Sequence, residues 1–91
     1  MWKVAKFTAD GNLNHPVVVR KVILEHSSAT TAAVYNEGSD SHTAALLICT
    51  VRNTTTALVT EVDFGEEGTV FKNGCGIDWN AGTVLVLYKE C

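Results

Sequence analysis

Residues 68–91 read GTVFKNGCGIDWNAGTVLVLYKEC, and this stretch decides the fold class. It contains three short apolar segments separated by the turn pairs Asn73-Gly74 and Ala81-Gly82. Such spacing is typical of β-strands in a chain that reverses direction every few residues. The last segment, residues 83–88, has apolar side chains at both alternating positions, which predicts a strand at the centre of a sheet. The stretch therefore predicts an all-β domain.

The same pattern of short apolar segments and polar turns fills the rest of the chain. Further strands are expected at residues 2–8, 17–26, 31–36, 43–51 and 56–64. With the closing segments this makes about eight short strands, which predict one compact antiparallel β-sandwich domain, jelly-roll-like, over residues 1–91.

Two of these strands carry more specific expectations. In residues 17–26, strict alternation places Val17 and Val19 on the face opposite to Val22 and Leu24, with residues 22–24 as the buried centre. Residues 43–51, TAALLICTV, are expected to form a buried strand because Ile48, Thr50 and Val51 are β-branched. A short helix is the alternative for this segment.

The N-terminal residues leave two possibilities open. Residues 2–8 alternate like a strand and break at Asp10-Gly11-Asn12, a turn signature. Terminal segments are ordered only where something pairs with them. Residues 1–10 are therefore expected either as an edge strand or as an arm that crosses onto a neighbouring subunit. In the second case Trp2 and Phe7 would be its apolar contacts.

Composition excludes several classes of function. The chain has seven basic residues and a formal net charge of −3, which argues against nucleic-acid binding. No apolar run approaches the ~20 residues of a membrane span, and no signal peptide is visible at the start. We therefore expect synthesis in a cytoplasm and no membrane association. The three cysteines have no C-x-x-C spacing and are expected to be reduced thiols.

Candidate chemistry is sparse. Asp40-Ser41-His42 contains the residue types of a hydrolase triad, but triad members normally come from separate elements, so we interpret it as a solvated loop. His15, His26 and His42 have no i, i+2 or i, i+4 partner and no nearby cysteine. We therefore expect no metal site, no cofactor and no enzymatic activity. The triplet Asn53-Thr54-Thr55 matches the N-glycosylation pattern and is interpreted as a plain turn.

Three motifs carry a resemblance to a known family. Residues 31–36 contain the pattern T-x-x-V-Y-N, residues 68–77 contain G-x-x-F-x-N-G followed by an apolar residue, and residues 84–88 read V-x-V-x-Y. Over residues 20–89, this order resembles small virion proteins of tailed phages with a β-sandwich or jelly-roll domain. The matching residues are Thr31, Val34, Tyr35, Asn36, Gly68, Phe71, Asn73, Gly74, Ile77, Val84, Val86 and Tyr88. Cys75 departs from the pattern, because an apolar residue is expected there, and this leaves the register of the hairpin open.

The resemblance implies a structural function. Members of this family act as capsid decoration (cement) proteins, head spikes or tail accessory domains. It implies that this chain binds the major capsid protein on the virion surface and stabilises the head, after synthesis in the host cytoplasm. It also implies a homo-oligomer, with a trimer favoured, and Trp2 and Phe7 become candidate capsid contacts.

A glycan-binding or receptor-binding module of a phage spike or tail is the alternative function. Sandwich modules bind sugars by stacking them on exposed aromatic rings. This chain offers Tyr35, Trp79 and Tyr88 as candidate rings and Asp78 as a candidate carboxylate beside them. The alternative requires these side chains to share one exposed surface.

Overall fold

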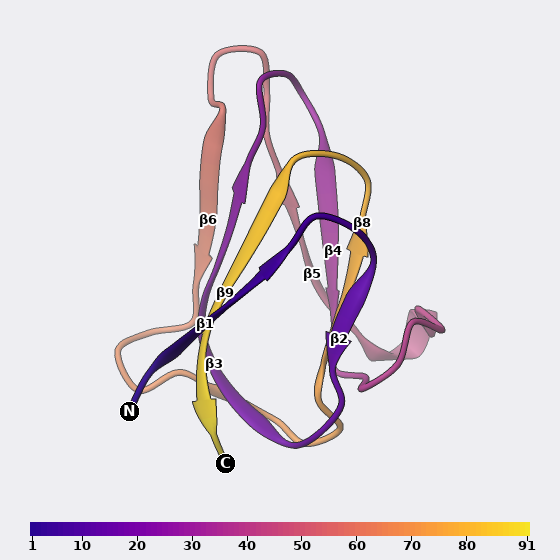
Figure 1. Cartoon of the computed structure of the whole chain (residues 1–91), viewed down its shortest axis with the longest axis vertical. Helices are drawn as coiled ribbons and strands as arrows, with labels where there is room; N and C mark the ends of the chain where they lie inside the picture. The colour runs from indigo at the N-terminus through magenta and orange to yellow at the C-terminus, as the bar shows by residue number, and fades with distance from the viewer.

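The protein is an all-β sandwich in the computed structural model, which describes residues 1–91 (Figure 1). Its nine strands are β1 (Lys3–Phe7), β2 (Gly11–Leu13), β3 (Val17–Glu25), β4 (Thr31–Tyr35), β5 (Leu47–Arg52), β6 (Val59–Asp63), β7 (Thr69–Phe71), β8 (Cys75–Trp79) and β9 (Thr83–Glu90). One 3₁₀ turn, η1 (Ala44–Leu46), precedes β5. No helical segment has the length and apolarity that crossing a membrane requires. The predicted fold class is confirmed.

The strands form two antiparallel sheets with nested pairing. Sheet A has the order β1-β9-β3-β6, and β7 pairs with the other half of β3 along the same edge as β6. Sheet B has the order β2-β8-β4-β5. The first strand thus pairs with the last, β2 with β8, β3 with β6 and β7, and β4 with β5. This is a long hairpin rolled into two layers, which is the jelly-roll connection.

The core lies between the two sheets and consists mainly of β-branched side chains, as expected for the inner faces of a sandwich. Twelve buried residues form one cluster: Val17, Val19, Val22, Leu24, Ala32, Val34, Val51, Phe71, Cys75, Ile77, Val84 and Val86. Cys75 is fully buried, so it takes the core position at which the motif has an apolar residue. No pocket is present.

A bulge in β3 changes which residues face the core. The register between β3 and β9 shifts between Val19 and Lys21, so Arg20 is an extra residue on β3. The alternation therefore reverses at Arg20, and Val19 and Val22 both point inward. The prediction of strict alternation through residues 17–26 was wrong at this point, because a bulge leaves no mark in an apolar pattern.

The prediction for residues 43–51 was partly wrong. The segment begins with the 3₁₀ turn and continues as β5, which is an edge strand of sheet B. Leu47 and Ile48 are 46% and 43% exposed, whereas Val51 is buried. The reason is topological: β5 has β4 on one side and no strand on the other, and a second register shift lies opposite Val34 and Tyr35.

Residues 3–7 form an edge strand rather than a free arm. β1 pairs with β9 along its whole length, and its end is tied by the Lys3 ammonium, which lies 3.2 Å from the Glu90 carboxylate. Phe7 packs against the core cluster. The expected turn at residues 10–12 starts earlier in the structure, because Gly11 already belongs to the short strand β2. The two chain ends lie close together at one end of sheet A (Figure 1).

Candidate functional site

The loop of residues 36–46 folds over the outer face of sheet B. The Asn36 amide donates to the Leu46 carbonyl (2.9 Å) and so closes the ends of the loop. Inside it, the Thr43 amide and hydroxyl donate to the Glu37 carboxylate at 2.9 and 2.6 Å. These hydrogen bonds, the side-chain one first, lower the pKa of Glu37 below its ordinary value. The loop is therefore internally braced, as compact surface loops often are.

Contacts with two other segments hold this loop in place. The Asn12 amide donates to the Asp40 carboxylate at 2.9 Å, and the Asn73 backbone amide donates to the Asn36 side chain at 3.0 Å. The second contact joins the last residue of the T-x-x-V-Y-N motif to the asparagine of the second motif. A Cβ on Gly74, whose φ is +107°, would lie 2.1 Å from a backbone oxygen, so only glycine fits there.

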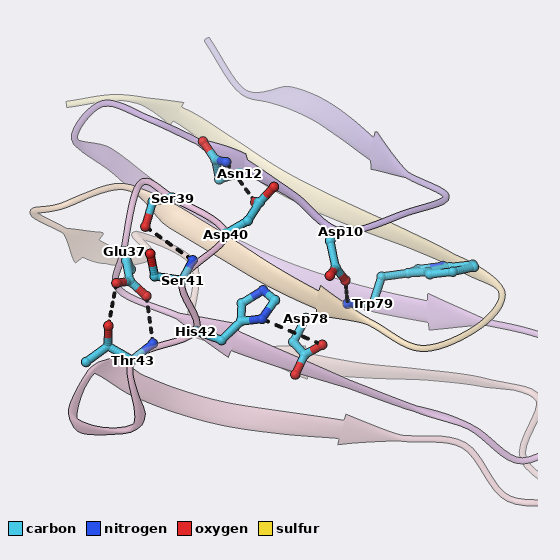
Figure 2. A network of polar contacts seen from close by, with 10 residues as sticks. All are labelled: Asp10, Asn12, Glu37, Ser39, Asp40, Ser41, His42, Thr43, Asp78 and Trp79. Atoms are coloured by element: carbon cyan, nitrogen blue, oxygen red, sulfur yellow. Dashed lines mark hydrogen bonds and ion pairs between the residues drawn. The ribbon is translucent and has the colours of Figure 1, made fainter.

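Three ligand-type side chains meet where this loop crosses the sheet (Figure 2). Asp10 comes from the turn before β2, His42 from the loop and Asp78 from β8. One ligand atom of each lies within 4.8 Å of the others. We call this group the Asp10–His42–Asp78 cluster. Its donors, one imidazole and two carboxylates, are those that bind first-row divalent metal ions.

The surroundings of the cluster restrict how its members can move. The Trp79 backbone amide donates to one oxygen of Asp10 at 2.7 Å. The His42 ring stacks on Tyr35 with 5.3 Å between ring centroids and 28° between planes. Its Nδ1 lies 3.9 Å from an Asp78 oxygen, and its side chain is 19% exposed. The Nε2 atom is buried without a hydrogen-bond partner.

The triad interpretation of residues 40–42 finds no support in this geometry. Asp40 accepts from Asn12, and the Ser41 amide donates to the Ser39 hydroxyl at 3.4 Å. His42 turns instead toward Asp78 (Figure 2). The three side chains belong to a folded loop, as the sequence indicated, but His42 takes part in a long-range group.

The candidate glycan residues do not share one surface. Tyr35 is 9% exposed and lies beneath His42. Trp79 packs against the core, and its indole N–H donates to the Gly82 carbonyl at 2.8 Å. Tyr88 packs against the core from sheet A, while Asp78 belongs to the cluster. These four residues therefore form no continuous stacking platform.

The outer face of sheet A has apolar side chains at its centre. Side chains that alternate with the core residues of β9 and β3 point to this side. Among them, Leu85 pairs with Ile23 and Leu87 pairs with Val4, so apolar groups adjoin across three strands. Val4 is 63% exposed. We call the patch of Val4, Ile23, Leu85 and Leu87 the sheet A face.

Charged residues and Trp2 border the sheet A face. The Trp2 ring has the Lys89 ammonium 4.9 Å and the Arg20 guanidinium 5.6 Å from its centroid. Both distances fit cation–π contacts. On the β6 side, Lys21 lies 3.2 Å from Glu61. Of the two predicted contact residues, Trp2 therefore lies beside an outward-facing apolar patch, whereas Phe7 is partly buried against the core cluster.

Two further predictions concern single side chains. All three cysteines are free, and burial raises the pKa of Cys75 to about 12. Asn53 is 2% exposed, and its side-chain amide donates to the Leu58 carbonyl at 2.7 Å. Because this amide nitrogen is buried and bonded, Asn53 is a structural residue of the β5–β6 junction in this fold.

Comparison with known proteins adds no family: no protein-family model, no curated protein and no solved structure matches this chain. Function is therefore argued from the residues. The sequence pointed to His42 and Asp78 separately but did not connect them with Asp10. Their only sequence signal was that each is a polar residue beside a predicted turn or strand end, and that signal does not tell which of them meet.

Proposed function

We propose that this protein is a structural virion protein of a tailed phage, which binds the major capsid protein as a decoration (cement) protein and stabilises the head. The observation that carries the proposal is the sheet A face. Antiparallel sheets usually turn one face to the core and a polar face to water. Here the outward positions of the central strands include the partly exposed Ile23, Leu85 and Leu87, interspersed with Lys21, Glu25 and Lys89. Together with the exposed Val4, they make an apolar patch among charged residues, as on a surface that contacts another protein.

The borders of this face fit a protein partner. Apolar patches with a charged rim are typical of protein–protein interfaces, and Trp and Arg contribute strongly to binding at such sites. Trp2 and Arg20 lie together at one end of the patch. No pocket is present, and we therefore place the partner on an outer surface.

The proposed mechanism is linkage. A ligand that binds the assembled shell better than free capsid subunits stabilises the shell by the difference in binding free energy. The family resemblance further implies that the protein is a homo-oligomer, with a trimer favoured, and several weak attachments would then add avidity. Native mass spectrometry of the purified protein measures this oligomeric state.

The test compares capsids with and without the protein in a heating series. Val4→Asp places a charge on the sheet A face at an exposed edge-strand position, so the fold should survive and binding to the capsid should fall at least tenfold. Thr50→Asp, at an exposed position on β5 of the other sheet, is the matched control. Equal disruption temperatures with and without the native protein would refute cementing, and equal losses in both variants would refute the sheet A face as the contact.

We do not propose glycan binding at the four candidate residues. Tyr35 is covered by His42, and Trp79 and Tyr88 pack on the core. A sugar would have no exposed pair of rings among them on which to stack.

A further inference from the structure

We propose that the Asp10–His42–Asp78 cluster binds one divalent first-row transition-metal ion, with Zn²⁺ the expected ion. This inference is independent of the proposed virion function. It departs from the expectation of no metal site, which considered only ligands close together in the sequence.

The spacing of the three donors is the first argument. The His42 Nδ1 lies 3.9 Å from the Asp78 oxygen, and one donor atom from each of the three residues lies within 4.8 Å of the others. A good hydrogen bond would bring these atoms to about 3 Å. Two ligands bound to one tetrahedral Zn²⁺ at 2.0–2.2 Å lie about 3.4 Å apart. The donors are therefore not hydrogen-bonded to one another. Shifts of about 1 Å or less per side chain bring their atoms to the separation of ligands on one metal ion.

The state of the His42 ring is the second argument. Its Nε2 is fully buried without a partner, and its Nδ1 makes no hydrogen bond within 3.5 Å. A largely buried imidazole that makes no hydrogen bond costs free energy. A metal ion on Nδ1 would occupy the nitrogen that faces Asp78, whereas the buried Nε2 would still lack a partner, so only the Nδ1 position supports the site. Neither Asp10 nor Asp78 forms an ion pair with a lysine or arginine that would compete with the metal.

The support around the donors is the third argument. Metal ligands are usually held by hydrogen bonds and packing behind them. Here the Trp79 amide binds one oxygen of Asp10 and leaves the other free, and Tyr35 fixes the plane of His42 by stacking. The loop that carries His42 is braced in turn by Glu37. The cluster is thus set on supported positions from three segments (Figure 2).

The donor set selects the class of metal. One imidazole nitrogen with two carboxylates favours Zn²⁺ and its first-row neighbours over Mg²⁺ and Ca²⁺, which prefer oxygen ligands alone. Three protein ligands leave a fourth position for water. Bound metal would join the loop of residues 36–46 to β2 and β8, and it would stabilise the folded state in proportion to the logarithm of its concentration above its Kd.

Metal binding by the full chain tests the proposal. Equilibrium dialysis with Zn²⁺, followed by elemental analysis, should give one ion per chain, and Zn²⁺ should raise the melting temperature in a way that EDTA reverses. Asp78→Asn keeps the shape of the side chain and should weaken Zn²⁺ binding at least tenfold, as should His42→Ala. His15→Gln removes a surface histidine that lies 2.7 Å from Glu90, and it should leave binding unchanged.

A spectroscopic readout locates the site and separates it from adventitious binding. In ¹H–¹⁵N NMR spectra, Zn²⁺ should shift the Trp79 amide, which donates to Asp10, and leave the amide of Val18 on β3 in place. The proposal is overturned if native protein binds Zn²⁺ no better than Asp78→Asn, or if His15→Gln removes the binding. If His42→Ala does not fold, Asp78→Asn alone decides the question.

Discussion

Asn53 allows the sharpest test of how the two sheets are joined. The chain leaves sheet B at β5 and enters sheet A at β6, and Asn53 lies at this crossing with a 2% exposed side chain. Its amide group donates to the Leu58 carbonyl at 2.7 Å, and its oxygen accepts from the Thr60 hydroxyl. Asn53→Ala removes both hydrogen bonds without touching the backbone bond from Asn53 to Thr30.

The expected loss of unfolding free energy depends on which hydrogen bonds the partners of Asn53 still make in the variant. The Leu58 carbonyl retains a hydrogen bond from the His26 amide at 3.1 Å. The single proton of the Thr60 hydroxyl has the Arg52 carbonyl at 3.1 Å as a second acceptor, so it can turn to that oxygen when Asn53 is removed. Neither partner is left unsatisfied, so the loss is about 1 kcal/mol for each bond, or about 2 kcal/mol in all. For a domain of this size that corresponds to a fall in Tm of roughly 8–16 °C.

Urea unfolding followed by tryptophan fluorescence measures this loss, with the m-value checked for constancy. Thr56→Ala in the same turn is the control, because Thr56 is exposed and its change should stay within about 0.5 kcal/mol. A loss for Asn53→Ala below about 0.5 kcal/mol, or one equal to the control, would show that the crossing does not depend on this side chain.

Three further predictions concern glycines, thiols and pH. Gly74→Ala should cost at least about 2 kcal/mol more in unfolding free energy than Gly65→Ala, because both have positive φ but only Gly74 has backbone within contact of a new Cβ; similar losses would contradict this. In thiol-labelling experiments Cys91 should react first and Cys75 only on unfolding, since Cys75 is buried with a pKa of about 12; equal rates would contradict the burial. The pKa of Glu37 is lowered from its ordinary 4.5 in the folded state, so its contribution to stability is present above that pH and is lost as the pH falls through the lowered value. Urea titrations should therefore show Glu37→Gln less stable than native protein at pH 7 and the difference shrinking at pH 3; a constant difference would refute the assignment.

Local signals in the sequence were enough to predict that the strands form two packed sheets. Asn73-Gly74 and Ala81-Gly82 mark the chain reversals that flank β8, and the apolar residues of β9 on both faces predicted its central place in sheet A. These features depend only on neighbouring residues. A sandwich follows from them because short strands of this kind must bury one face against a second sheet.

Long-range features could not be predicted in the same way. The bulge at Arg20 depends on the register with β9, and the exposure of Leu47 depends on β5 being an edge strand. The cluster depends on three segments that meet only after both sheets have formed. Alternation along one strand contains no information about its partner, so a single sequence does not specify which turns come together.

The two outer faces of the sandwich should act independently, and this follows from how each is covered. On sheet B, the loop of residues 36–46 covers the outer surface: His42 stacks on Tyr35, and Asp40 accepts a hydrogen bond from Asn12. Polar side chains of this loop therefore determine what can bind on that face. On sheet A, apolar side chains stay outward and adjoin across β1, β9 and β3. Since the core cluster separates the two faces, a change to the Asp10–His42–Asp78 cluster removes metal donors without moving the patch. Asp78→Asn should therefore weaken Zn²⁺ binding at least tenfold and leave attachment through the sheet A face unchanged, whereas coupled losses would mean that loop and patch belong to one interface.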